Sequence, residues 1–207
     1  EQIKPFDGPP RPPTAYLMRQ LVKAHAMGIA IPKWVVPADI AAEMDAFLNG
    51  RTPVVITLRE ATYWPPRNSN LEAWVTFAKT CGEDVIFVRD TAKADVSIDG
   101  FETCPRASKD LLWRAALMEK AKANLMVANG PIGLALYMDA PWLMFGVLTP
   151  EIPEYKPGRP EWWATKMGVP VGSQYPWSHA GQRIVWEKDT LTAIETAWTA
   201  IRPPTLP

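Results

Sequence analysis

The sequence predicts an α/β protein: a Rossmann-like parallel sheet of about five or six strands with helices on both faces. Three observations indicate this. Short apolar runs, some rich in β-branched residues, alternate with segments whose apolar residues recur at helical spacing. The 207-residue chain is 47% hydrophobic and 21% charged, which is typical of a globular protein with a sizeable core. No internal repeat interrupts this alternation, and right-handed crossovers would place every strand-end loop on one edge.

Residues 1–50 are expected to form an N-terminal arm and helices, either a cap or the remnant of an acceptor-binding domain. The proline-rich residues 1–13 indicate an extended arm. Thr14 precedes a predicted helix that ends at Gly28. Residues 31–36 suggest a short extended piece, and a second helix is predicted from Pro37 to Leu48, stopped by Asn49-Gly50.

Residues 51–207 are expected to form the Rossmann-like domain. Its first strand, Arg51–Leu58, is β-branched and bounded by a turn. Ser69 or Asn70 is placed to cap a helix over Leu71–Lys79. The next strand is Asp84–Val88, and Val96–Ile98 is a candidate for a short third strand before a loop at Gly100–Pro105.

The stretch from Ala107 to Gly146 predicts a β-α-β unit preceded by a helix. Ser108 is a candidate cap for a helix reaching Lys122. Asn124–Ala128 is an apolar run of the kind buried on both faces of a parallel sheet. After the turn Asn129-Gly130-Pro131, a short helix over Ile132–Met138 and a strand over Trp142–Phe145 are expected.

The last part of the chain is less periodic. Residues 149–177 are rich in proline and tryptophan, with one short helix expected near Glu161–Met167. A final strand is predicted at Arg183–Trp186. Thr190 then leads a terminal helix to Ile201, where Arg202-Pro203-Pro204 stops it.

Composition excludes several classes of function. The 22 Lys and Arg residues balance the 22 Asp and Glu residues, so no net field favours nucleic acid. No apolar run approaches the roughly 20 residues of a membrane span. Cys81 and Cys104 lack metal-binding spacing, so we expect reduced cysteines, no metal site and a cytoplasmic location. The chain begins at Glu1, which suggests a processed amino terminus or a longer chain.

Polar residues gather where predicted strands end. Because parallel strands end at one edge, these loops are expected to converge there, and two arginines beside a helix start would bind phosphate or diphosphate. Gly130 would allow close backbone approach. The alternative is that Arg59 and Arg89 pair with Glu60 and Asp90 at the surface. The candidate residues are Arg59, Glu60, Tyr63, Arg67, Asn68, Arg89, Asp90, Thr91, Asn129, Gly130, Pro131 and Gly133.

Several catalytic signatures are absent from the sequence. The turn at Asn129-Gly130 matches neither G-x-G-x-x-G nor a P-loop, and there is no G-x-S-x-G elbow. With two histidines, one of them (His179) in the irregular segment, no Ser/His/Asp arrangement is credible.

The run from Pro53 to Gly146 resembles the C-terminal, nucleotide-sugar-binding half of GT-B glycosyltransferases, the heptosyltransferase-like kind in particular. The strand, polar loop and helix VVITLRE…RNSNLEAWVTFAK, the strand VIFVRDT and the run LLWRAALMEKAKANLMVANGPIGLALYMDAPWLMFG carry the resemblance. It aligns Asn129, Gly130 and Pro131 with the family's D-S-G-P-x-H turn. The family's histidine is absent, with Ile132 or Gly133 in its place.

The resemblance implies that residues 51–207 bind a nucleotide-diphosphate sugar and transfer the sugar without a metal ion. Arg59 or Arg89 and the Asn129-Gly130 turn would stabilise the leaving diphosphate. Glu60 or Asp90 is the candidate base or ribose contact. No other cofactor is expected. A GT-B enzyme needs a second domain, so a second domain or a second copy of the chain is the expected partner.

Two rival functions remain open. One is a non-catalytic binding or assembly module on the same fold, with the segment at 149–177 contacting another protein. The other is a sugar-nucleotide epimerase or hydrolase, since a fold does not fix a function.

Overall fold

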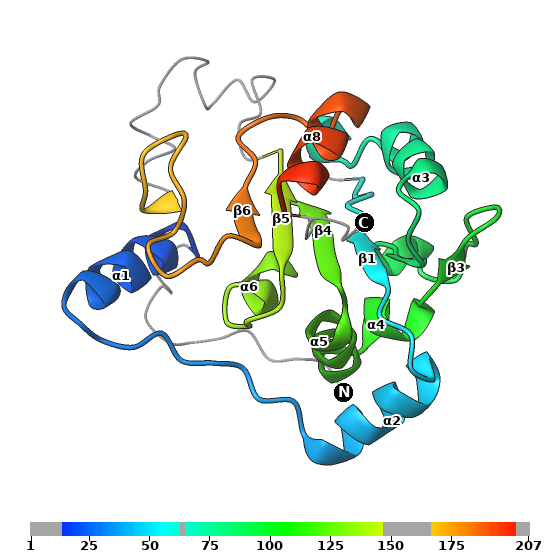
Figure 1. Ribbon diagram of the computed structural model, residues 1–207, viewed down its shortest axis with the longest axis horizontal. Helices are drawn as coiled ribbons and strands as arrows, with labels where there is room; N and C mark the ends of the chain where they lie inside the picture. The colour runs from blue at the N-terminus through cyan, green and yellow to red at the C-terminus, as the bar shows by residue number, and fades with distance from the viewer. Residues whose placement is uncertain (1–13, 63–64, 147–166, 202–207) are drawn as a thin grey trace, which may run out of the picture.

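The computed structural model, which describes residues 14–62, 65–146 and 167–201, folds around a six-stranded, all-parallel sheet (Figure 1). The strand order is β3-β2-β1-β4-β5-β6. This confirms the predicted fold class. The strands are β1 (Val54–Thr57), β2 (Val85–Val88), β3 (Glu102–Thr103), β4 (Ala123–Val127), β5 (Trp142–Phe145) and β6 (Gln182–Ile184).

The described helices precede, connect and follow the strands. They are α1 (Thr14–Ala26), α2 (Ala38–Leu48), α3 (Leu71–Thr80), α4 (Pro105–Lys109), α5 (Leu111–Lys120), α6 (Ile132–Ala135) and α8 (Leu191–Ile201), with 3-10 turns η1 (Pro65–Arg67) and η2 (Thr91–Lys93). The chain builds outward from β1 to β3, and then crosses back to place β4 on the other side of β1. Ligands of open parallel sheets bind outside the strand carboxyl ends at such a reversal of strand order.

Both faces of the central strands are buried, because successive side chains of a strand point to opposite sides. Val54 and Ile56 on β1 belong to one apolar cluster, and Val55 between them belongs to another. The same alternation runs through β2, β4 and β5. These strands therefore lack the polar face of a solvent-exposed sheet.

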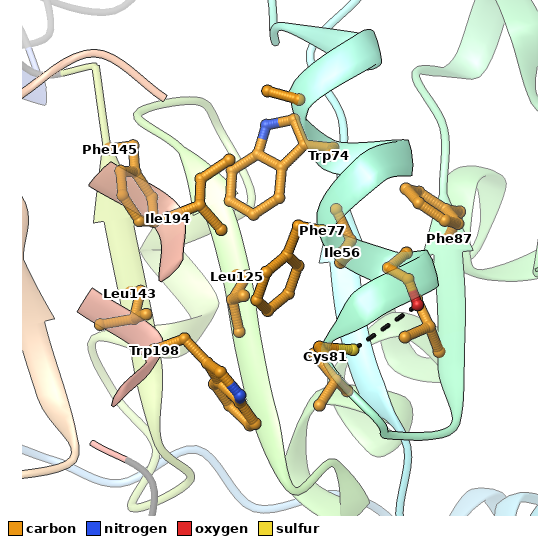
Figure 2. Packing of buried hydrophobic residues seen from close by; sticks show 14 of the residues in the cluster. Ile56, Trp74, Phe77, Cys81, Phe87, Leu125, Leu143, Phe145, Ile194 and Trp198 are labelled. Carbon is orange, nitrogen blue, oxygen red and sulfur yellow. Dashed lines mark hydrogen bonds between the residues drawn. The ribbon is translucent and has the colours of Figure 1, made fainter. Parts of the chain in front are cut away.

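Helices α3 and α8 cover one face. Trp74 and Phe77 of α3 pack with Ile194 and Trp198 of α8 over Phe145 and neighbouring strand residues (Figure 2). Trp74 and Phe145 meet edge to face with ring centroids 5.3 Å apart, a favoured aromatic geometry. This packing fixes the first turn of α3 relative to the end of β5.

Helices α2, α4, α5 and α6 lie on the opposite face. Met44 and Leu48 of α2 pack with Ala116 and Leu117 of α5 against Val55, so α2 shares this core. As predicted, α2 ends where Asn49 and Gly50 take left-handed conformations, with φ of 47° and 81°.

Several predicted elements differ from the structure. The third strand lies at Glu102–Thr103, where it pairs with Ile86 and Phe87, and not at Val96–Ile98. Residues 31–36 join no strand, although the Trp34 amide bonds the Tyr137 carbonyl. The helix expected over Ile132–Met138 ends at Ala135. Most of the helix expected near Glu161–Met167 falls outside the described residues.

The helix before β4 is also divided differently from the prediction. Ser108 lies inside the short helix α4, and its hydroxyl donates to the Arg89 carbonyl over 2.8 Å. Asp110 is the cap of α5, because its carboxylate accepts from the amides of Leu112 and Trp113. The chain therefore bends between α4 and α5.

Candidate functional site at the carboxyl edge of the sheet

The ends of β2, β1 and β4 lie side by side. Thr57 at the end of β1 is in register with Val88 on β2 and with Met126 on β4. The loops that follow these strands therefore start at neighbouring points on one edge. They carry Arg59 and Glu60, then Arg89 and Asp90, and finally Asn129 and Gly130, so the structure brings these predicted residues to three adjacent strand ends.

The loop after β1 folds back on itself. The Arg59 amide donates to the Ser69 hydroxyl, and the Ser69 amide donates to the Arg59 carbonyl, both over 2.9 Å. The buried Arg59 guanidinium donates to Asn68 Oδ1, while Asn68 Nδ2 donates to the Ala61 carbonyl. These bonds hold Arg67 and Asn68 over the end of the sheet.

Arg67 joins the loop after β1 to the end of β4. Its Nη2 donates to the Ala128 carbonyl over 2.9 Å. Because β1 and β4 flank the reversal of strand order, this bond crosses the position at which such sheets bind ligands.

Glu60 and Arg89 form a buried, two-pronged ion pair. Arg89 Nε donates to Glu60 Oε2 over 2.9 Å, and Nη2 donates to Oε1 over 2.5 Å. The remaining Arg89 donor, Nη1, bonds the carbonyls of Val96 and Ser97. Burial alone would raise the pKa of Glu60, but the hydrogen bonds and charge of Arg89, aided by Lys93, together lower it.

Asp90 and Thr91 also bond to the protein itself. Asp90 Oδ2 accepts from the Glu60 amide over 2.8 Å, and the Thr91 hydroxyl donates to the Ser108 carbonyl over 3.1 Å. Nearby, the buried Arg114 guanidinium donates to the Ala107 carbonyl. Burial lowers the Arg114 pKa, and the Asp90 charge partly opposes that effect. This network ties the ends of β1 and β2 to α4 and α5.

The turn after β4 is sterically open. Within the part of the chain that the structure describes, an added Cβ at Gly130 or at Gly133 would meet no atom within 4 Å. The protein's own packing therefore does not require glycine at either position. The following helix α6 is a single turn after Pro131, and its Gly133 and Leu134 amides already bond the carbonyls of Gly130 and Pro131. The buried Asn129 Oδ1 has no hydrogen-bond partner among the described residues.

A small pocket lies at the ends of β4 and β5 and beside the loop that follows β6. Its volume is about 170 Å³, less than the roughly 300–1,000 Å³ of sites that enclose a drug-sized ligand. Two of the predicted residues, Arg67 and Asn68, line it. The lining residues are Pro66, Arg67, Asn68, Asn70, Val127, Gly146, Lys188, Asp189 and Thr190.

Asp189 is a pocket residue that the sequence analysis did not select. Its side chain is buried, and Oδ2 accepts from the Asn70 amide and from Trp74 Nε1, each over 2.7 Å. Burial raises the pKa of Asp189, and these hydrogen bonds oppose that rise only in part. Asp189 follows the last strand and precedes the last helix, so the rule that selects polar residues after strands would have found it if applied to β6.

The predicted site residues therefore divide into groups. Arg67 and Asn68 line the pocket, whereas Asn129, Gly130, Pro131 and Gly133 are not among its lining residues. Arg59, Glu60, Arg89, Asp90 and Thr91 bond within the protein. Tyr63 lies outside the described residues. Ligand contacts and catalytic roles for all of them stay predictions.

The described residues form neither a metal-binding cluster nor a membrane-spanning helix. No group of three or more His, Cys, Asp or Glu side chains there is placed to hold a metal ion. Within the same ranges, no helix is long and apolar enough to cross a membrane.

The fold and the edge site define an α/β protein of the Rossmann-like class. Among solved structures, it is similar to the glycosyl transferase family 9 from Veillonella parvula DSM 2008, with a TM-score of 0.52 and 13% sequence identity. The match covers 82% of this chain and 53% of that chain, so this chain spans about half of its length. The likeness is one of fold. No protein-family model and no curated protein sequence matches the chain.

Proposed function

We propose that the chain binds a nucleotide-diphosphate sugar at the carboxyl edge of its sheet and acts as the donor-binding part of a metal-independent glycosyltransferase. The observation that carries the proposal is the Arg67 side chain, which bonds the Ala128 carbonyl across the strand-order reversal. Beside this bond stands a turn with no packing reason to contain glycine. The fold likeness to a family 9 glycosyltransferase supports the same reading.

The residues divide into two tasks in this proposal. Arg67, Asn68 and the open Asn129-Gly130-Pro131 turn with Gly133 would contact the donor, with Arg59 orienting Asn68 through their hydrogen bond. Glu60 and Arg89 would position the loops, because a carboxylate with a lowered pKa is a poor proton acceptor. Of the two predicted carboxylates, Glu60 and Asp90, this leaves Asp90 as the candidate base or ribose contact. Its Oδ2 accepts a hydrogen bond from the Glu60 amide. The acceptor substrate would be held by a second domain or by another chain.

The experiment is calorimetric titration with UDP, GDP and ADP and with their sugar conjugates. Gly130→Val is the informative variant, because no atom of the described residues lies within 4 Å of a Cβ placed there and the backbone does not need glycine. We expect the variant to keep its melting temperature and to bind the donor at least about tenfold more weakly.

Lys109→Gln provides the matched control, since Lys109 pairs with Asp95 at the exposed surface. Absence of binding to any nucleotide or nucleotide sugar would contradict the proposal and favour an assembly module. Product analysis with a labelled donor would then separate sugar transfer from hydrolysis or epimerisation.

A further inference from the structure

We propose that the pocket at the ends of β4 and β5, beside the loop that follows β6, binds a terminal phosphate group, as in a phosphomonoester or inorganic phosphate, and that Asp189 shares a proton with it. The proposal goes beyond a donor-sugar site, because the internal diphosphate of a nucleotide sugar carries no proton at neutral pH. It rests on the pocket's size, its charged lining and the hydrogen bonds of Asp189.

The size of the pocket suits a compact group. A volume of about 170 Å³ is room for several water molecules, and so for a tetrahedral anion. A complete nucleotide would extend out of it. The walls are polar on several sides. The side-chain oxygens of Asn70 and Thr190 accept from the amides of Ala73 and Ala193, so the Asn70 NH2 group and the Thr190 O–H are the neutral donors of the lining.

The charges that line the pocket favour an anion. They are the cations Arg67 and Lys188 and the carboxylate of Asp189; the other lining residues are uncharged. The positive charge of Lys188 lowers the pKa of Asp189, so these two charges interact. Among the charged lining residues, the Arg67 guanidinium is then the excess positive group. Guanidinium is well shaped for phosphate oxygens. The pocket therefore attracts an anion although one of its walls is a carboxylate.

The carboxylate makes the pocket selective. Asp189 accepts from the Asn70 amide, from Trp74 Nε1 and from its own backbone amide. An ionised carboxylate has about four acceptor positions, so one further donor can bind. A terminal phosphate supplies that donor as an O–H group, because its second pKa is about 6. If the proton resides on Asp189 instead, the carboxyl group donates to the phosphate dianion, and the complex holds the same single proton.

The competing positions at this edge are less suited to a terminal phosphate. All the polar nitrogens of the Arg89 side chain donate to Glu60 or to backbone carbonyls. Helix α6 is one turn long, and its Gly133 and Leu134 amides bond within the turn. Arg67 and Lys188, in contrast, both line the pocket itself.

The test is an NMR titration of ¹⁵N-labelled protein with inorganic phosphate and, separately, with sulfate at matched ionic strength. Sulfate has the same shape and no proton at neutral pH. We expect saturable shifts of the Asn70, Gly146 and Thr190 amides with phosphate, and at least about tenfold weaker binding of sulfate. Equal affinity for the two anions, or shifts elsewhere only, would overturn the proposal.

Two variants separate the charge from the proton. Lys188→Gln should weaken phosphate and sulfate alike, by about tenfold, because both lose one cation. Asp189→Asn keeps an oxygen acceptor for Asn70 and Trp74 and removes the carboxylate. It should abolish the preference for phosphate over sulfate and tighten sulfate binding. A loss of both anions in Asp189→Asn would mean that Asp189 is only structural. Arg183→Gln, on an exposed position of β6, is the control.

The source of the phosphate is distinguished by comparing UMP, a sugar 6-phosphate and intact UDP-glucose. If UMP or the sugar phosphate binds through its terminal phosphate, it should shift the NMR signals of the pocket amides. That binding should depend on Lys188 and Asp189. UDP-glucose binding that depends on Gly130 and not on Asp189 would support both proposals. If UDP-glucose fails to bind while phosphate still does, only the donor proposal falls. If UDP-glucose occupies the pocket and phosphate does not, the terminal-phosphate proposal falls alone.

Discussion

The indole N–H of Trp74 donates to Asp189 Oδ2 over 2.7 Å, which joins the first turn of α3 to the residue that precedes α8. Trp74 is fully buried among the apolar residues of the α3 and α8 face. Its hydrogen bond therefore links the hydrophobic core directly to the wall of the pocket.

Replacing Asp189 by alanine should destabilise the fold more than replacing it by asparagine. Alanine leaves the Trp74 N–H and the Asn70 amide without their acceptor, and each lost acceptor costs about 1–3 kcal/mol. Asparagine keeps an oxygen in place and avoids burying a charge. Urea unfolding of the two variants at pH 7 measures the difference. Equal losses would show that the two hydrogen bonds do not matter to stability.

The pH dependence of stability offers a second test of Asp189. Because its folded pKa is raised by burial, the folded state holds this proton more tightly than the unfolded state does. Its contribution to the free energy of unfolding therefore falls as pH rises from about 3.9, the ordinary Asp value, through the raised value. Subtracting the Asp189→Asn stability curve from the wild-type curve should reveal this decline. A difference that grows more favourable with pH would contradict it.

The Glu60–Arg89 pair predicts the opposite trend. Because the Glu60 pKa is lowered overall, its stabilisation is fully present above about pH 4.3, the ordinary Glu value, and is lost as pH falls through the lowered value. Glu60→Gln should cost about 3 kcal/mol at pH 7, since it leaves Arg89 buried without its carboxylate. Chemical unfolding at pH 7 and at low pH checks both statements.

Lys93→Met is the control for that measurement. Lys93 also contacts Glu60, but its side chain is half exposed, and exposed ion pairs contribute about 0–1 kcal/mol. A Lys93→Met cost as large as that of Glu60→Gln would show that the buried pair is not the main stabilising contact.

The Glu60–Arg89 pair also shows where sequence reasoning reaches its limit. One interpretation of the sequence is that Arg59 and Arg89 pair with Glu60 and Asp90 at the surface. The structure pairs Arg89 with Glu60, and this pair is buried and not at the surface. Side chains of consecutive residues in an extended chain point to opposite sides, so Arg59 and Glu60 do not face each other. Glu60 instead contacts Arg89, which follows the adjacent strand β2. That choice depends on strand order, which no local pattern reveals.

The parts of the fold that were predicted are those with strong local signals. The apolar cores of β1, β2, β4 and β5 and the Asn70 cap of α3 follow from propensity and spacing. The two-residue strand β3 was misplaced, because Glu102-Thr103 has no apolar pattern and becomes a strand only through its pairing with β2. In the site, Lys188 and Asp189 lie after β6, in a segment whose sequence carries no turn or glycine signal that would predict a ligand.

The helix cap assigned by the structure can be tested against the one expected from sequence. Asp110→Ala should lower the free energy of unfolding by about 1 kcal/mol, because the amides of Leu112 and Trp113 lose their side-chain acceptor. Asp110→Asn should lose much less, since asparagine is also a good cap. A thermal-melt series of the two variants measures this. A negligible cost for alanine would argue against Asp110 as the cap.

Gly168 should be the most sensitive of the described glycines to substitution. A Cβ at this position would lie 2.9 Å from Arg19 Cα, and its φ is +76°. Both the backbone conformation and the contact with α1 therefore disfavour any side chain. We expect Gly168→Ala to displace α1, seen as faster amide hydrogen exchange over residues 18–26, while β1 and β4 keep their protection. Gly130→Ala, where a Cβ meets open space, is the matched control and should leave exchange unchanged. Unaltered exchange in Gly168→Ala would mean that α1 does not rest on this glycine.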